Sequence, residues 1–299
     1  MAEESTQRRP PRPSRGRRRP ERADRTERPD RPERAERPGG TERPELPGRA
    51  VTFRYPPAEG PCDDGPALEL LAGGELTVEG RLVAASNATL YCTVELDGQT
   101  AACVYKPVAG ERPLWDFPLG TLAGREVAAY AVSQAAGWNL VPPTVMRDGP
   151  YGPGMCQLWI DADTSTDLVA LARSRDQPKL RDMAVFDAAI NNADRKIGHL
   201  LPIGDGRLYG CDHGVCFAEE YKLRTVLWQW RGQKLPGRAL AALARLKEEL
   251  VTGSLAAALP ELLSEDEVTA TKDRVELLIE HRVHPYPPEN WPAVPWPPV

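Results

Sequence analysis

The chain has 299 residues, of which 41% are hydrophobic, with 38 basic and 43 acidic side chains. Residues 1–50 carry a net charge of +5 and residues 51–299 a net charge of −10, and an acidic body argues against general nucleic-acid binding, which needs a basic surface. The sequence contains no run of 18 apolar residues, so no transmembrane segment is predicted.

Residues 1–50 are predicted to be a disordered tail. They contain 15 Arg, 9 Pro and 10 acidic residues, and they lack Phe, Trp, Tyr, Ile and Cys. Such a segment cannot bury enough apolar surface to offset the entropy lost on ordering. It could be a solvated tail without a specific role, or an electrostatic tether to an acidic partner or membrane surface. The interleaved acidic residues weaken the second interpretation.

The cysteines indicate a reducing compartment. No CxxC pair occurs, and the N-terminal segment lacks the apolar stretch of a secretory signal. We therefore expect a cytoplasmic protein with reduced thiols, several of them in the core. The six cysteines are Cys62, Cys92, Cys103, Cys156, Cys211 and Cys216.

Residues 51–161 are predicted to form a β-rich N-terminal lobe. Short apolar or alternating runs predict strands at 76–83, 89–96, 101–105, 144–147 and 155–160. Asp97-Gly98 is expected to be the turn between the second and third strands. Apolar residues at helical spacing predict a helix over 122–136, which Gly137 ends.

Residues 162–299 are predicted to form a mostly helical C-terminal lobe. The patterns predict helices at 180–191, 239–250 and from Ser264 to about His281, with a hairpin of 200–203 and 207–211. Ser264 and Glu267 have the spacing of a capping box. The Pro-rich residues 285–299 are expected to pack as an extended tail over the helices, and His281 and His284 to lie at the surface. The order of elements predicts an α+β fold in two lobes.

Two acidic residues with a regular spacing to neighbouring histidines follow the first helix of the second lobe. Asp194 precedes His199 by five positions, and Asp212-His213-Gly214 begins 18 residues after Asp194, across the predicted hairpin. In protein kinases a catalytic Asp is followed five positions later by a metal-binding Asn, and an Asp-x-Gly on the next strand holds Mg²⁺. The spacing predicts that Asp194 faces an acceptor hydroxyl and that Asp212 reaches the same phosphates through metal.

The first lobe offers matching phosphate-binding residues. Lys106 ends the third strand, and Glu126 lies 20 residues later in the predicted helix. A strand lysine held by a helix glutamate orients the α- and β-phosphates of ATP. Ser86 and Asn87, in the turn between the first two strands, could present backbone N–H groups to the phosphates.

Over residues 75–285 the sequence resembles the phosphatidylinositol 3-/4-kinase-like superfamily, and within it a small actinobacterial branch. The Asn-x-Asp-Arg run is also similar to that of type II lipid kinases and of toxin-type bacterial protein kinases. The resembling motifs are Ser86-Asn87-Ala88-Thr89, Val104-Tyr105-Lys106-Pro107, Pro113-Leu114-Trp115-Asp116-Phe117-Pro118, Gly124-Arg125-Glu126, Asn192-Ala193-Asp194-Arg195 and Asp212-His213-Gly214.

The resemblance implies a two-lobed protein-kinase-like fold with ATP between the lobes. It implies that Lys106 binds the α- and β-phosphates with Glu126 as its partner, and that Asp194 orients or deprotonates the acceptor hydroxyl. It further implies that Asp212 ligates Mg²⁺.

The resemblance also places the adenine-binding hinge at 157–160, with Gln157, Trp159 and Ile160 as cofactor-binding residues. One position departs from the pattern, because His199 stands where the metal-binding Asn is expected. A neutral imidazole can ligate divalent metal, but Mg²⁺ prefers oxygen donors. Mg²⁺ and Mn²⁺ therefore both remain candidates, and His199 could equally be structural.

Each of these residues also has a structural interpretation. Asp194 could cap the preceding helix, Asp212 could be a turn residue, and Lys106 alone could be a solvent-facing strand residue. Cys211 and Cys216 flank Asp212-His213-Gly214, where packing of small thiols explains them better than a metal or redox site does.

The sequence thus predicts an ATP-dependent phosphotransferase that moves the γ-phosphate to a hydroxyl of a small molecule, lipid or protein. One alternative is a pseudokinase, a nucleotide-binding regulatory module without transfer, which His199 favours. A second alternative is a serine/threonine protein kinase. The acceptor and the oligomeric state are left open.

Overall fold

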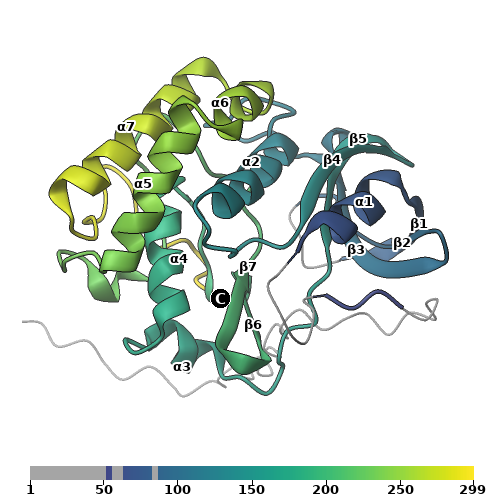
Figure 1. Cartoon of the computed structure of the whole chain (residues 1–299), viewed down its shortest axis with the longest axis horizontal. Helices are drawn as coiled ribbons and strands as arrows, with labels where there is room; N and C mark the ends of the chain where they lie inside the picture. The colour runs from purple at the N-terminus through teal and green to yellow at the C-terminus, as the bar shows by residue number, and fades with distance from the viewer. Residues whose placement is uncertain (1–51, 56–62, 83–86) are drawn as a thin grey trace, which may run out of the picture. The chain divides into compact units, whose positions relative to one another are not determined.

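The computed structural model describes residues 52–55, 63–82 and 87–299, apart from the side chain of residue 205. The predicted disordered tail at 1–50 and the candidate phosphate-binding residue Ser86 lie outside the described residues. Figure 1 shows a sheet-rich part, followed along the chain by a mostly helical part. The predicted α+β class is confirmed.

A five-stranded antiparallel sheet forms the first part. Its strands are β1 (Glu75–Arg81), β2 (Leu90–Leu96), β3 (Gln99–Pro107), β4 (Thr144–Gly149) and β5 (Gly152–Leu158), in the spatial order β1-β2-β3-β5-β4. Asp97 and Gly98 join β2 to β3 with φ values of 48° and 79°, the backbone of a two-residue hairpin turn. All five strands agree with the predicted ones except at their ends, where assignments commonly vary.

Two helices pack against this sheet. The helix α1 (Gly65–Gly73) buries Ala67, Leu70 and Leu71 in the same apolar cluster as the strands. Its sequence, which contains Pro near its start and Gly at both ends, does not predict it. The helix α2 (Leu122–Ala135) contacts β4 and β5 on one side and helices of the second part on the other. Most of α2 is therefore buried, including the charged Arg125 and Glu126.

The second part consists of helices around one apolar core. Its elements are α3 (Leu168–Arg173), α4 (Pro178–Ala189), β6 (Leu200–Ile203), β7 (Arg207–Gly210), α5 (Gly237–Val251), α6 (Ser254–Ala258) and α7 (Glu265–His281). The predicted helices and hairpin correspond to α4, α5, α7 and β6–β7, whereas α3 and α6 are too short for a periodic pattern to reveal. In the described part of the chain, no helix has the length and apolar character required to cross a bilayer.

The predicted capping box at the start of α7 is confirmed. Ser264 Oγ accepts the Glu267 N–H at 3.2 Å, and Glu267 Oε2 accepts the Ser264 N–H at 3.0 Å. Short 3-10 turns complete the fold at Val108–Gly110, Ile197–His199, Gly204–Gly206, Trp228–Trp230 and Leu259–Glu261.

The C-terminal residues 285–299 form no helix or strand, and they run along the segment 220–228 to the loop that contains Asp194, whereas the sequence predicts that they pack over the helices. Ala293 O accepts hydrogen bonds from Thr225 N at 3.1 Å and from the Trp228 indole at 2.7 Å. Pro298 O accepts the Ile197 N–H at 2.9 Å. Figure 1 shows this end of the chain between α4 and β7.

Close backbone contact joins β3 to β5 beside Lys106. Gly154 pairs with Pro107 in the register of the two strands. A Cβ at Gly154 would lie 2.5 Å from Lys106 O and 2.7 Å from Pro107 Cα, both backbone atoms that cannot move alone.

Gly154→Ala should therefore destabilise the protein by about 1–3 kcal/mol through overpacking of the strand pair. Urea unfolding followed by circular dichroism would measure this. Gly237→Ala is the control, since a Cβ at the start of α5 meets no neighbouring atom and should be neutral or slightly stabilising. Equal stability of the two variants would contradict the assigned contact.

The surface position predicted for His284 is wrong. His284 is buried, its Nε2 accepts from Arg181 Nε at 3.1 Å, and its ring stacks on Trp230. Burial, with the Arg181 charge adding to it, lowers the pKa of His284 to about 4. The chain turns back toward α4 here, a tertiary contact that no local pattern shows.

This pKa predicts an acid-sensitive contribution to stability. Because the unfolded imidazole has a pKa near 6.5, the unfolded chain binds the extra proton first, and stability is lost as pH falls from about 6.5 to about 4. In His284→Gln, the free energy of unfolding should depend less steeply on pH over that range. The reduction in slope corresponds to at most about one proton taken up on unfolding. An unchanged slope in His284→Gln would refute the prediction.

Candidate active site

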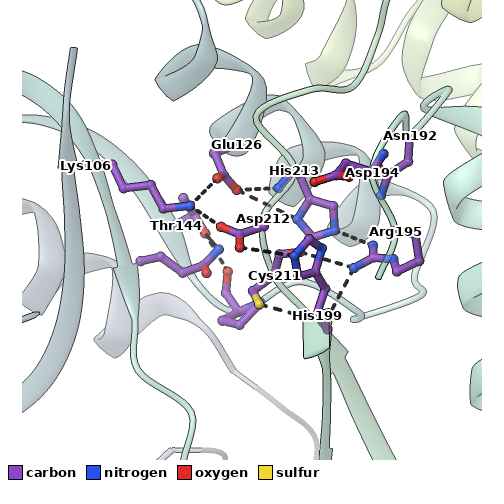
Figure 2. A network of polar contacts seen from close by, with 12 residues as sticks. Lys106, Glu126, Thr144, Asn192, Asp194, Arg195, His199, Cys211, Asp212 and His213 are labelled. Atoms are coloured by element: carbon purple, nitrogen blue, oxygen red, sulfur yellow. Dashed lines mark hydrogen bonds and ion pairs between the residues drawn. The ribbon is translucent and has the colours of Figure 1, made fainter. Parts of the chain in front are cut away.

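Lys106 connects the sheet to two acidic side chains (Figure 2). Its Nζ lies 2.7 Å from Glu126 Oε1 on α2 and also contacts Asp212 Oδ1, just after β7. Lys106 is positioned by the pairing of β3 with β5, and Asp212 by a backbone with φ of 58°. Residues 106 positions apart in the chain thus form one ion cluster.

The charges of this cluster stabilise one another. Burial alone would lower the pKa of the Lys106 ammonium, but Asp212 and Glu126 outweigh burial and raise that pKa above the usual lysine range. The Lys106 charge in turn holds the pKa of Asp212 well below its usual range. Both groups are therefore ionised at neutral pH, and the carboxylate of Asp212 remains about half exposed.

His199 lies on the other side of Asp212. Its Nε2 is 3.5 Å from Asp212 Oδ2, while its Nδ1 is buried without a hydrogen-bond partner. Burial lowers the pKa of His199, so the ring is neutral at pH 7 and one nitrogen has a free lone pair. Among the described residues, no group of three or more His, Cys, Asp or Glu side chains forms a ready-made metal cage. Asp212 and His199 thus offer two possible metal ligands.

Asp194 lies in the loop between α4 and β6. The loop starts at Asn191, whose φ is 52°, and Asn192 Oδ1 accepts the Asp194 N–H at 2.9 Å. The Asp194 carboxylate is 31% exposed and pairs with Lys196 Nζ at 3.1 Å. It does not cap α4 through its side chain, since the cap position of that helix is Ile190. The loop backbone is fixed while the carboxylate can still reach solvent.

Arg195 holds the two loops together from inside, a role that the sequence pattern does not predict. Its buried guanidinium bonds Asp187 on α4 at 2.8 Å and the carbonyl of Cys211 at 3.1 Å. Its Nη2 also lies 2.8 Å from His213 Nε2. A guanidinium only donates, so His213 Nε2 accepts and the ring proton is on Nδ1, 3.9 Å from Glu126 Oε2.

A buried polar chain therefore runs through the site. The backbone N–H of His213 donates to Glu126 Oε2 at 2.9 Å, and Asn192 donates to Asp187 Oδ1 at 2.9 Å. Burial lowers the pKa of His213 strongly, so its ring is neutral. Glu126 thus links Lys106 to His213, which contacts Arg195 in turn.

The predicted hinge residues lie on β5 and just beyond it. Gln157 is buried and donates from Nε2 to Thr144 Oγ1 at 2.8 Å, and the Trp159 indole N–H donates to Asp161 Oδ1 at 3.1 Å. Ile160 packs in a small apolar cluster with Leu201 and Tyr209 of the hairpin. The side chains of these three positions therefore make internal contacts.

The remaining candidates also have internal partners. Asn87 Oδ1 accepts the Arg112 N–H at 2.9 Å, which joins the β1–β2 connection to the segment after β3. Cys211 is largely covered and Cys216 fully buried, and burial raises the pKa of both thiols. Packing, not reactivity, accounts for these cysteines.

The sheet with Lys106, the helix with Glu126 and the two loops with Asp194 and Asp212 form one candidate active site in an α+β fold. Comparison with protein-family models gives no match. The chain is 47% identical to Protein Rv2133c of Mycobacterium tuberculosis over 262 residues, covering 76% of this chain and 94% of that protein. It belongs to the same family as Protein Rv2133c.

Two further comparisons are more distant. Phosphatidylinositol 4-kinase gamma 4 of Oryza sativa subsp. japonica is 27% identical over 175 residues, which cover 46% of this chain and 31% of the plant protein. Among solved structures, the Helicobacter pylori proinflammatory kinase CtkA is 12% identical with a TM-score of 0.45, covering 71% of this chain and 94% of that one.

The Arg195–Asp187 pair predicts a large effect on stability. Both side chains are fully buried, so Asp187→Asn leaves the guanidinium charge without a counter-ion. We expect a loss of about 3–5 kcal/mol in the free energy of unfolding, measured in urea. Glu276→Gln removes a partner of the exposed pair with Lys247 and should cost about 0–1 kcal/mol. A loss below about 1 kcal/mol for Asp187→Asn would contradict the inferred role.

Proposed function

We propose that the chain is an ATP-dependent phosphotransferase of the phosphatidylinositol 3-/4-kinase-like type, acting in the cytoplasm and belonging to an actinobacterial branch of that superfamily. The observation that carries the proposal is the ion cluster of Lys106, Glu126 and Asp212, brought together from a strand, a helix and a loop. This is the set of groups that phosphoryl transfer requires for charge neutralisation at the phosphates.

Lys106 would bind the α- and β-phosphates of ATP, with Glu126 holding its ammonium in place. The carboxylate of Glu126 is 3% exposed and accepts from both Lys106 and the His213 backbone, so it cannot rotate away without losing both contacts. A lysine oriented in this way presents a fixed positive charge and needs no rearrangement during transfer.

Asp194 would act on the acceptor hydroxyl. In the proposed reaction the acceptor oxygen bonds to the γ-phosphorus, the bond from that phosphorus to the bridging oxygen breaks, and ADP leaves. The hydroxyl proton passes to the Asp194 carboxylate, which is partly exposed and therefore accessible to an acceptor. General-base assistance of this kind contributes about 10²–10⁴-fold.

Asp212 and His199 fit a divalent cation. One carboxylate oxygen and one neutral imidazole nitrogen lie 3.5 Å apart, and water and phosphate oxygens would complete the ligand set. Such an ion, Mg²⁺ or Mn²⁺, would neutralise charge on the β- and γ-phosphates. The imidazole is a softer donor than the Asn found in kinases, which supports Mn²⁺ as a candidate beside Mg²⁺.

A nucleotide-binding pseudokinase is the second candidate, and His199 at the metal position is the observation that favours it. The two functions differ in whether the γ-phosphate of ATP is transferred to an acceptor. Purified protein would be incubated with γ-labelled ATP and Mg²⁺ or Mn²⁺, with separate protein and small-molecule fractions of an extract and with phosphatidylinositol vesicles. Label in one arm supports transfer and identifies the acceptor class. ATP binding without label in any arm would support the pseudokinase and overturn the transferase.

Asp194→Ala should reduce transfer at least about 100-fold, because the proton then has no acceptor in the site. ATP affinity should stay within about twofold, since the ion pair of Asp194 is with Lys196, which is not one of the proposed phosphate-binding groups. Turnover and calorimetric ATP binding would measure the two quantities. Asp148→Ala, at an exposed position on β4, is the control and should keep wild-type turnover. Unchanged turnover in Asp194→Ala would remove the proposed base.

A further inference from the structure

Arg125, directly before Glu126 in α2, is a fully buried arginine whose contacts leave the helix in three directions. Its Nη1 donates to the carbonyl of Cys216 at 2.7 Å, and its Nη2 pairs with Glu267 on α7. The guanidinium lies over the Phe117 ring, 4.9 Å from its centroid. One side chain therefore joins α2 to α7 and to the loop that follows Asp212.

Both carboxylate oxygens of Glu267 also have partners. Its Oε1 takes the Arg125 guanidinium, while its Oε2 accepts the Ser264 N–H of the capping box. The side chain is 8% exposed, and the two contacts fix the carboxylate from opposite ends. The start of α7 is thus attached to the helix that carries Glu126.

The backbone of α2 is held at the same place. A Cβ at Gly124 would lie 2.9 Å from the carbonyl oxygen of Leu262, so the helix touches the segment before α7 directly. Glu126 follows two residues later and bonds both Lys106 and the His213 N–H. Any rotation or shift of α2 at Arg125 would move Glu126 relative to both partners.

We propose that Arg125 and Glu267 are a positioning pair that fixes α2 against the helical part, so that Glu126 stays on Lys106 and on the Asp212 loop. The inference rests on the proposed function, in which Lys106 binds ATP. Apolar residues would fill the same space at lower desolvation cost, so stability alone does not account for a buried ion pair here. The hydrogen bond to Cys216 O supplies an orientation that an apolar side chain could not.

The test separates positioning from folding. Arg125→Met alone leaves Glu267 buried and unpaired and could unfold the protein, so the main variant is Arg125→Met with Glu267→Met, which removes both charges. We expect this double variant to stay folded and to lose about 10–100-fold in ATP affinity, as supporting residues around a site typically do when removed. Lys247→Met, which breaks the exposed α5–α7 ion pair, is the matched control and should keep wild-type affinity.

Two readouts distinguish the proposal from a merely structural role. If Arg125 acts through Glu126, adding Glu126→Gln to the double variant should cause no further loss of ATP affinity, whereas independent effects would multiply. The single variant Arg125→Lys keeps the positive charge beside Glu267 and should bind ATP more tightly than the double variant does. Wild-type affinity in the folded double variant, or multiplicative effects, would overturn the positioning role.

Hydrogen exchange tests the role of the Arg125–Glu267 pair without ATP. In the double variant, exchange should accelerate in peptides of α2 and of 212–218 and stay unchanged in α5, without ATP present. If the wild-type protein fails to bind ATP, the proposed function fails while this readout still tests the pair. Uniform acceleration across all peptides, or none in α2, would overturn the inference.

Discussion

The structure of the site depends on one buried carboxylate. Glu126 accepts Lys106 from the sheet with one oxygen and the His213 backbone N–H from the loop with the other. A buried carboxylate must be fully paired, because leaving either oxygen without a partner incurs the desolvation penalty of a charge. The requirement therefore constrains three elements at once: β3 in its register, α2 in its rotation and the Asp212 loop in its unusual backbone conformation. The shared carboxylate thus couples the positions of these three elements.

Arg195 imposes the same kind of constraint on the second half of the site. Its guanidinium donates to Asp187, to the Cys211 carbonyl and to His213, so the loop with Asp194 and the loop with Asp212 are fixed on one charge. His213 is the residue that contacts both systems, through its backbone to Glu126 and through its ring to Arg195. The interior is polar here, although packing alone would favour apolar side chains. Hydrogen bonds between buried polar groups fix the orientation of the two loops as well as their distance. The positions of the two loops in the site are therefore set more by hydrogen bonds than by apolar packing.

The elements that the sequence predicts are those with a local signal. The strands, α2, α4, α5 and α7 have periodicity, and the capping box of Ser264 and Glu267 has a fixed spacing. The pairing of Lys106 with Glu126 is predicted on other grounds, because a strand lysine held by a helix glutamate is the arrangement that orients ATP phosphates in kinases. What the sequence does not reveal are contacts between distant segments: α1 against the sheet, His284 against Trp230, and Arg195 as the centre of two loops. A buried charge looks like a surface charge in a sequence, since only the tertiary partner distinguishes the two.

The surroundings of the two loop carboxylates differ in a way that assigns their roles in the proposed reaction. Asp212 is engaged at both oxygens, by Lys106 at one and by His199 at the other, and the lysine keeps it ionised. Within the described residues, Asp194 is paired at one oxygen only, by Lys196. A carboxylate that must gain a proton needs an oxygen free to receive it, while one that must remain charged is best placed beside a cation, as Asp212 is beside Lys106. Asp212 is therefore suited to hold charge beside the phosphates and Asp194 to accept a proton, and the exchange of those roles would require a different set of neighbours.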